Sequence, residues 1–176
     1  MKSQVLFENT SYVNVRDSIE NGDIVFVHGD KNGFHPFRQL IMWATGSQFI
    51  HVGIAFTVRA AGENRVMLAE AQGGTRRRIV NLSFYENLPL TVVRTDKKWD
   101  EMGPRVLERF GQERYGWIAA IYAGLRDYLS REWNIHLKKR NLPHEICSEF
   151  VAKILEMDSD SITPQKLYEN IVNATY

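Results

Sequence analysis

Cysteine is nearly missing from this 176-residue sequence, which carries a single one at position 147. One thiol excludes an intramolecular disulfide and any zinc or iron–sulfur site that needs several cysteines. The five histidines are scattered and include no HxxxH pair, so we expect neither a metal nor another cofactor. Cys147 therefore either packs as a small apolar side chain or performs chemistry.

An excess of charge of one sign is missing as well, because 22 basic and 21 acidic residues leave a net charge of +1. Without a global positive field we expect no nucleic-acid partner, despite short basic runs at Arg76–Arg78 and Lys138–Arg140. Arg76 and Arg78 alternate and are interpreted as a solvated strand face. Arg77 points to the other face, where it can pair with an acid.

Long apolar runs are also absent. The longest, Tyr115–Leu125, is too short to cross a bilayer, and the segment Met1–Asp23 lacks the apolar core of a signal peptide. We therefore expect a protein without a transmembrane segment that is made in the cytoplasm. Association with a virus particle is the alternative, because it would leave no trace in the sequence. No pattern indicates an oligomeric state.

The patterns that are present describe one domain, residues 21–176, preceded by a polar N-terminal extension, residues 1–20. Strands are expected at Ile24–Val27, Ile50–Val58, Arg65–Gln72, Arg76–Leu82 and Leu90–Arg94. Helices are expected from Pro36 and at Pro104–Phe110, Ile118–Arg131, His144–Glu156 and Pro164–Asn173. Strands first and helices after predict an α+β class, with an antiparallel sheet packed against helices.

The strand around His51 alternates between two faces. One face is apolar and carries Ile50, Val52, Ile54 and Phe56. His51 lies on the other face with two small residues, Gly53 and Ala55, so another element could approach the imidazole closely. A histidine that simply meets solvent at a strand edge is the alternative, and this strand alone favours it.

Glu70 stands in an otherwise apolar strand. A buried, unpaired carboxylate is costly, so Glu70 needs a partner or an exposed position. A hairpin that turns at Ala60–Asn64 and pairs Ile54 with Met67 would place His51 opposite Glu70 on one face, and a slip of one residue would separate them. A surface charge on an edge strand is the alternative.

Cys147 lies near the start of the expected helix His144–Glu156. It shares an apolar stripe with Phe150, Val151 and Ile154. That stripe is typical of a buried core cysteine. The first turn of a helix, however, stabilises a thiolate and offers free amides to an oxyanion. With His51 and Glu70, Cys147 makes a Cys–His–acid set suited to nucleophilic catalysis.

Several short motifs follow one another in an order known from one family. They are Gly22-Asp23-Ile24-Val25-Phe26, His51-Val52-Gly53-Ile54, Glu70-Ala71, Cys147-Ser148-Glu149 and Pro164-Gln165-Lys166-Leu167. In these motifs the chain resembles the circularly permuted papain-like amidases of the NlpC superfamily, especially the YiiX-like group. The resemblance covers residues 21–176, and permutation accounts for a histidine that precedes the cysteine.

The resemblance implies a permuted papain-like (NlpC-type) fold and a thiol hydrolase of the amidase or peptidase type. Cys147 would be the nucleophile, His51 the general base and Glu70 the polar residue that orients it, with a thioester acyl-enzyme on a peptide or cell-wall-type amide. Tyr115-Gly116-Trp117 is similar to a Tyr-Asp segment of the family but departs from it at Gly116. His28 and His35 are candidates for a second oxyanion donor.

Two other functions compete with this hypothesis. One is a lipid-directed acyltransferase, thioesterase or lipase that acts on an acyl-lipid substrate, for which Phe34, Phe37, Trp43 and Phe49 could line an acyl groove. The other is a binding or structural module that keeps the fold and performs no chemistry.

Overall fold

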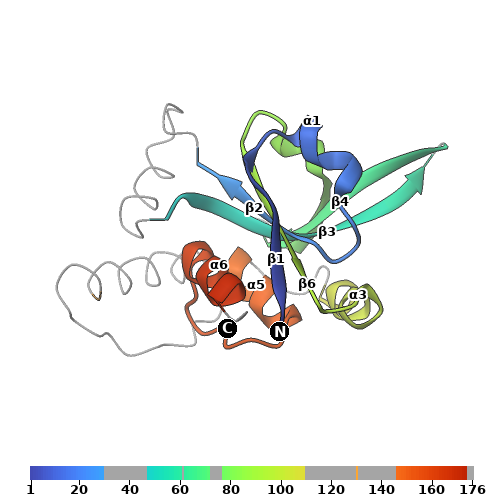
Figure 1. Ribbon diagram of the computed structural model, residues 1–176. Helices are drawn as coiled ribbons and strands as arrows, with labels where there is room; N and C mark the ends of the chain where they lie inside the picture. Colours follow the sequence, from blue (N-terminus) through green and yellow to red (C-terminus); the bar gives the residue numbers. More distant parts are fainter. Residues whose placement is uncertain (30–46, 61, 72–76, 110–129, 131–145, 174–176) are drawn as a thin grey trace.

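The computed structural model describes residues 1–29, 47–60, 62–71, 77–109, 130 and 146–173 of the chain. Within these ranges six antiparallel strands form one sheet in the order β1-β6-β2-β3-β4-β5 (Figure 1). The strands are β1 (Ser3–Thr10), β2 (Ile24–His28), β3 (Phe49–Ala60), β4 (Glu63–Ala71), β5 (Arg77–Asn81) and β6 (Leu90–Thr95). The expected α+β class with an antiparallel sheet is confirmed.

The helical elements cover both faces of this sheet. They are α1 (Tyr12–Val15), the 3-10 helices η1 (Arg16–Ser18) and η2 (Leu82–Tyr85), α3 (Trp99–Glu108), α5 (Cys147–Ile154) and α6 (Pro164–Asn173). Helices α5 and α6 lie side by side against one face, and α1 and η2 lie at the other (Figure 1). None of the helices in the described ranges has the length and apolar character needed to cross a bilayer.

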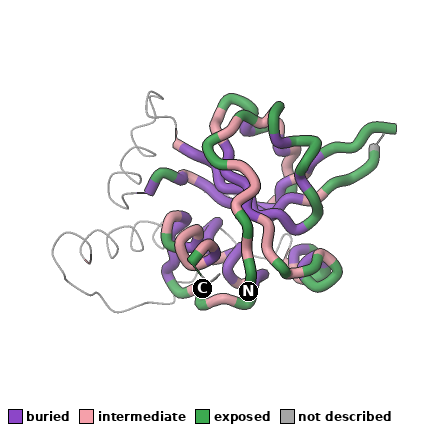
Figure 2. The backbone as a smooth tube through the Cα atoms, viewed as in Figure 1, coloured by how far each residue is buried: buried purple, intermediate pink, exposed green. Residues whose placement is uncertain are grey.

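Burial of the central strand β2 explains why its sequence is a continuous apolar run. Ile24 and Phe26 pack into the cluster beneath α5 and α6, whereas Val25 and Val27 pack into the cluster beneath α1 and η2. All four side chains are fully buried, as the purple centre of the sheet shows in Figure 2. A strand covered on both faces needs apolar residues at every position.

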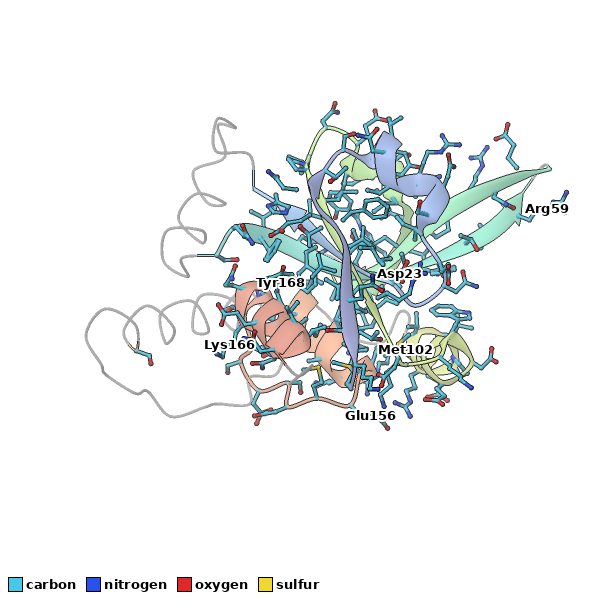
Figure 3. All side chains as sticks on the ribbon, in the orientation of Figure 1. Asp23, Arg59, Met102, Glu156, Lys166 and Tyr168 are labelled. Carbon is cyan, nitrogen blue, oxygen red and sulfur yellow. The ribbon has the colours of Figure 1, made fainter. Side chains whose placement is uncertain are left out.

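Aromatic rings fix the α6 side of the core. Tyr168, labelled in Figure 3, reaches from α6 to the sheet and packs with ring centroids 5.3 Å from Phe26 and 5.0 Å from Phe49. Phe49 is fully buried there, which makes it a core residue rather than the lining of an acyl groove. The other expected groove residues, Phe34, Phe37 and Trp43, lie outside the described residues.

Two elements differ from the sequence-based expectation. The segment set apart as an N-terminal extension contributes β1, which pairs with β6 at the edge of the sheet. Helix α3 begins at Trp99, whose ring stacks on Phe56 at 5.3 Å, and it carries Pro104 inside rather than at its start. This aromatic anchor stabilises the turn before Pro104, although the proline amide cannot close a hydrogen bond there. The helix expected from Pro36 lies outside the described residues, and so does the one expected at Ile118–Arg131, except for Ser130, which is helical.

Candidate active site

The register of the β3–β4 hairpin decides where His51 and Glu70 meet. Ile54 pairs with Ala69, so the expected pairing of Ile54 with Met67 is wrong by two residues. The strands extend to Ala60 and Glu63 and leave a tighter turn than the sequence suggested. Because side chains alternate with a period of two, a shift of two residues does not by itself move any side chain to the other face.

Beyond Ile54 and Ala69 the paired residues of this hairpin end, and the two strands follow different neighbours. His51 stays with β2, where it pairs with Val27. Glu70 stays with β5, where it pairs with Arg78. The imidazole and the carboxylate nevertheless meet across this end of the hairpin, with Nε2 of His51 2.9 Å from Oε2 of Glu70. The contact expected between residues directly opposite each other is therefore made diagonally.

Gly53 allows the two strands to approach closely just before this point. A Cβ atom at Gly53 would lie 2.7 Å from Cγ of Leu68 and 2.8 Å from the carbonyl oxygen of Ala69. Real side chains do not tolerate such contacts, so a larger residue would push β4 away from β3 and carry Glu70 with it. The small residue that the sequence showed beside His51 thus serves strand packing.

A β-bulge in β3 lies directly before the histidine. The pairing with β2 moves from Phe49 to His51 while β2 advances by one residue, so Ile50 is extra. Ile50 consequently packs into the cluster beneath α1 and η2, and the expectation that it shares a face with Val52 is wrong. Bulges of this kind redirect side chains and are common beside active sites.

Glu70 is a completely buried carboxylate with three side-chain donors. Oε2 accepts hydrogen bonds from His51 and from the hydroxyl of Tyr85 at 2.9 and 2.8 Å, and Oε1 accepts one from Nε of Arg78 at 2.7 Å. Burial alone would raise the pKa of Glu70, but these bonds outweigh it and hold the pKa below its ordinary value. Glu70 is therefore an ionised group in the interior, and the alternative of a surface charge on an edge strand is wrong.

Cys147 is the first residue of α5 and is 4% exposed. Its thiol lies close enough to the imidazole of His51 to interact with it electrostatically. Burial works against a charged imidazole, but the interactions with Cys147 and then with Glu70 raise the pKa of His51 to about 10. Since Nε2 faces Glu70, Nδ1 is the ring nitrogen left for the thiol.

The start of α5 is held from two directions. Glu149 accepts the backbone N–H of Ile146 at 3.1 Å on one oxygen and that of Ser161 at 2.9 Å on the other. The hydroxyl of Ser148 donates to the carbonyl oxygen of Ile162. The first-turn amides of a helix have no partner within the helix, so those around Cys147 can donate to an anion.

Sequence reasoning missed two residues of this site, Arg78 and Tyr85. Arg78 was expected on a solvated face, but its guanidinium binds Glu70 and lies 5.2 Å from the centre of the Phe84 ring. Tyr85 stacks on His51 with ring centroids 5.7 Å apart. Arg78 could have been predicted from its opposite charge to Glu70, because the two residues lie directly across from each other on β4 and β5. Nothing in the sequence around Tyr85, which follows the β5 strand in a short polar segment, predicts that it contacts His51 or Glu70.

The remaining expectations fall outside this cluster. His28 pairs with Thr91, with Nε2 2.7 Å from Oγ1, and burial lowers the pKa of His28. Arg77 is buried and donates to the carbonyl oxygen of Arg109 at 3.0 Å. His35 and the Tyr115 segment lie outside the described residues, as do Arg76 and the basic run Lys138–Arg140. The described part of the chain contains no cluster of three or more potential metal ligands.

Comparison with known proteins leaves the site to be interpreted on its own chemistry. No family model matches the chain, and no curated protein matches it. The arrangement of thiol, imidazole and carboxylate is thus the basis for assigning a function.

Proposed function

We propose that this protein is a thiol hydrolase that cleaves an amide bond through Cys147, His51 and Glu70. The observation that carries the proposal is the convergence of three groups: a thiol at the start of α5, an imidazole that interacts with it, and a buried carboxylate hydrogen-bonded to that imidazole at 2.9 Å. A nucleophile, a base within hydrogen-bond reach and a group that orients the base are the parts that acyl transfer requires.

Before acylation the thiol proton has passed to Nδ1 of His51, in keeping with the raised pKa of the imidazole, and the thiolate sulfur then attacks the carbonyl carbon of the substrate. The carbonyl oxygen becomes an oxyanion, which the backbone N–H of Cys147 stabilises at the positive end of α5. His51 then donates its proton to the leaving nitrogen as the C–N bond breaks. An amine leaves, and Cys147 carries the acyl group as a thioester.

In the deacylation step the neutral imidazole of His51 takes a proton from water. The resulting hydroxide attacks the thioester carbon, the C–S bond breaks, and the proton on His51 returns to the sulfur. Throughout both steps Glu70 accepts a hydrogen bond from Nε2, which holds the ring orientation and the tautomer.

We infer that the fold is a circularly permuted papain-like fold of the NlpC type. Support comes from the order of the parts: the histidine strand β3 and the carboxylate strand β4 precede the cysteine helix α5. It also comes from the contact of α5 with both of these strands. The peptide or cell-wall-type substrate rests on the sequence resemblance alone.

The test is the rate of Cys147 alkylation by iodoacetamide as a function of pH, followed by intact mass. In the wild type we expect rapid alkylation well below the ordinary thiol pKa of about 8.5, and in His51→Ala we expect it to slow and to follow an ordinary thiol profile. Because Cys147 is the only cysteine, a single mass increment reports on this thiol alone. A slow, ordinary profile in both proteins would identify a core cysteine and remove the enzyme hypothesis.

A positive result leads to a screen of amide and acyl-ester substrates. Cys147→Ala is expected to abolish turnover, because no other thiol is available. His28→Gln is the matched control, since His28 is buried on the neighbouring strand but bonds to Thr91. It should retain the fast alkylation of the wild type.

A further inference from the structure

Arg78 stands behind the proposed catalytic set, on the far side of Glu70 from the imidazole. Its Nε binds Oε1 of Glu70 at 2.7 Å, while Oε2 is the oxygen that serves His51. The carboxylate is completely buried, and the arginine side chain is 31% exposed. The two oxygens of Glu70 therefore have different partners: Oε1 binds the permanent cation Arg78, and Oε2 binds the imidazole of His51.

We propose that Arg78 is a positioning residue whose permanent positive charge keeps Glu70 ionised, so that His51 can release its proton during the reaction. The proposal rests on the proposed function, because it assigns Arg78 a task in that mechanism. Arg78 touches neither the thiol nor the expected substrate carbon and acts only through Glu70.

The physical reason lies in the changing charge of His51. While the imidazole is protonated, it compensates the buried carboxylate by itself. Once His51 has given its proton to the leaving group, that compensation is gone, and an isolated buried carboxylate would be very costly. Without a second cation, the pair would keep the proton, and His51 could not act as the base of the deacylation step.

Arg78 is suited to this task because its charge does not titrate. Among the described residues Glu70 is the only acid within ion-pair distance of Arg78. The Phe84 ring lies over the guanidinium at 5.2 Å, and Nη2 is buried without a hydrogen-bond partner in the described part of the chain. The positive charge is thus directed at one carboxylate, and the guanidinium is out of contact with water at Nη2 although the side chain is partly exposed.

Each titratable or charged group that contacts this carboxylate, or its imidazole partner, comes from a different element. The described groups are His51 from β3, Arg78 from β5, Tyr85 from η2 and Cys147 from α5. Tyr85 is neutral, and the thiol can be removed by substitution. In a Cys147→Ala background the balance between His51, Glu70 and Arg78 can therefore be measured directly.

The experiment is a pH titration of the His51 imidazole by 15N NMR in Cys147→Ala, with the resonance assigned by its loss in Cys147→Ala/His51→Gln. Adding Arg78→Met should raise the pKa of His51 by about 1 unit, because a nearby positive charge has been removed. Replacing Arg78 by lysine instead (Arg78→Lys), in the same Cys147→Ala background, should keep the pKa of His51 close to its value with Arg78 present. Arg65→Met is the matched control: Arg65 lies on β4 with its side chain 51% exposed and 3.8 Å from Glu63, and its loss should leave the titration unchanged.

The outcomes separate this inference from the proposed function. An unchanged or lowered pKa in a folded Arg78→Met protein would overturn the role of Arg78 and leave the thiol hydrolase standing. If Arg78→Met does not fold, Arg78→Gln keeps a donor for Glu70 without the charge, and the same upward shift is expected. A failed alkylation test in the protein with Cys147 would remove the hydrolase, whatever the titration shows.

Discussion

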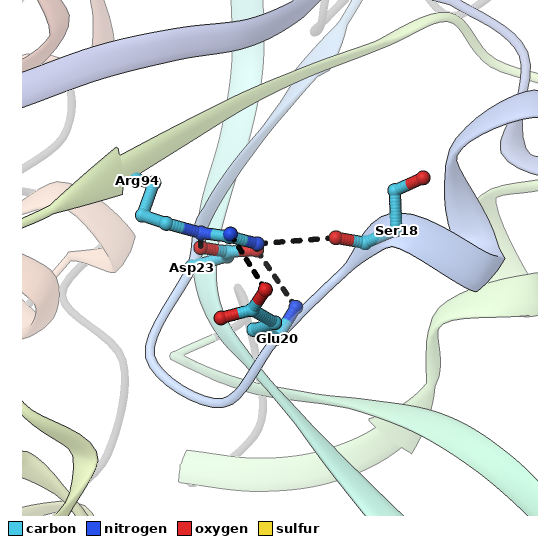
Figure 4. Close-up of polar contacts among 4 residues, drawn as sticks. All are labelled: Ser18, Glu20, Asp23 and Arg94. Carbon is cyan, nitrogen blue, oxygen red and sulfur yellow. Dashed lines mark hydrogen bonds and ion pairs between the residues drawn. The ribbon is translucent and has the colours of Figure 1, made fainter.

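Two buried carboxylates in this molecule are each bound by an arginine from a neighbouring strand, yet they are built differently. Asp23 is 1% exposed and accepts two hydrogen bonds from Arg94, at 2.8 and 2.9 Å, and one from the backbone N–H of Glu20 at 2.8 Å. Arg94 also binds the side chain of Glu20 and the carbonyl oxygen of Ser18, as Figure 4 shows. Glu70 instead receives one bond from its arginine and the rest from His51 and Tyr85.

The difference separates a structural ion pair from a site suited to chemistry. Neither the backbone amide nor Arg94 changes charge near neutral pH, so the Asp23 cluster stays fixed and ties the segment before β2 to β6. The Glu70 cluster contains an imidazole that can gain and lose a proton and that faces a thiol. A buried carboxylate bound to an arginine is thus weak evidence for function until its other partners are known.

The largest expected contrast is in turnover. Glu70→Gln should lower kcat of the substrate found by the screen by about 100-fold, because the amide no longer supplies the charge that orients and stabilises the imidazolium. Asp23→Asn should stay within about threefold of the wild type at a temperature where it is folded, since the two clusters share no residue. Equal losses in both variants would show that Glu70 acts only through stability.

The next contrast is in stability. Asp23→Ala should lower the free energy of unfolding by about 2 kcal/mol, because it leaves Arg94, which is partly exposed, without its main acceptor. Urea denaturation followed by circular dichroism measures the change. Asp17→Ala is the control: Asp17 also pairs with an arginine, at 3.1 Å, but its side chain is 86% exposed, and we expect a change below about 0.5 kcal/mol. A loss at Asp17 as large as at Asp23 would contradict the importance of burial.

A third contrast concerns pH. The pKa of His51 is raised from 6.5 to about 10, so the stability it contributes is complete below pH 6.5 and is lost as the pH rises toward 10. The difference in unfolding free energy between the wild type and His51→Gln should therefore shrink between these two values. The difference for Asp23→Asn should stay constant over the same window, because Arg94 remains protonated. Parallel curves for both variants would exclude a charged His51 in the folded state.

At acidic pH, Glu70 makes the stability depend on pH in the opposite direction to His51. The pKa of Glu70 is held below its ordinary value of 4.5 by His51, Arg78 and Tyr85, so its contribution is present above pH 4.5 and is lost as the pH falls through the lowered value. Acid titration of the wild type and Glu70→Gln, followed by circular dichroism, should show the two stabilities converging. A constant gap down to the unfolding of both proteins would contradict an ionised Glu70.

The positions of several helices and strands could be predicted from the sequence where a residue pattern was compatible with a single structure. The bounds of α6 and the start of β2 and β6 were correct, since a proline or a turn signal stands beside each. The hairpin register was not readable to within two residues, because two registers of the same parity bury the same apolar side chains. The strand β1 was missed because, at the sheet edge, all eight of its residues remain exposed or half-buried.

Only three residues of the candidate site could be predicted from the sequence. Cys147, His51 and Glu70 stood out because each is a polar or reactive residue in an apolar element. Arg78 was assigned to solvent because an arginine in an alternating strand is ordinarily exposed, and only the partner across the strand pair shows otherwise. The bulge at Ile50 could not be predicted either, because an extra residue in β3 does not interrupt the alternation of apolar and other residues along the sequence.

The smallest expected effect is at Tyr85, where the Glu70 cluster has a partner without charge. Tyr85→Phe removes the hydrogen bond of 2.8 Å to Glu70 but keeps the ring that stacks on His51. The loss of one donor to an ionised acceptor should cost about 1.5 kcal/mol of unfolding free energy and raise the pKa of Glu70 slightly. In the Cys147→Ala background, the His51 titration should move less than in Arg78→Met, because no charge is lost.

Tyr168→Phe serves as the control for Tyr85→Phe, since it removes a hydroxyl from α6, on the opposite face of the sheet. It should leave the His51 titration unchanged. A shift in Tyr85→Phe as large as in Arg78→Met would show that the number of donors, and not the arginine charge, governs the state of Glu70. The Glu70 cluster would then differ from the Asp23 cluster only in which groups donate its three hydrogen bonds, and the contrast between a fixed ion pair and a proton-exchanging one would fail.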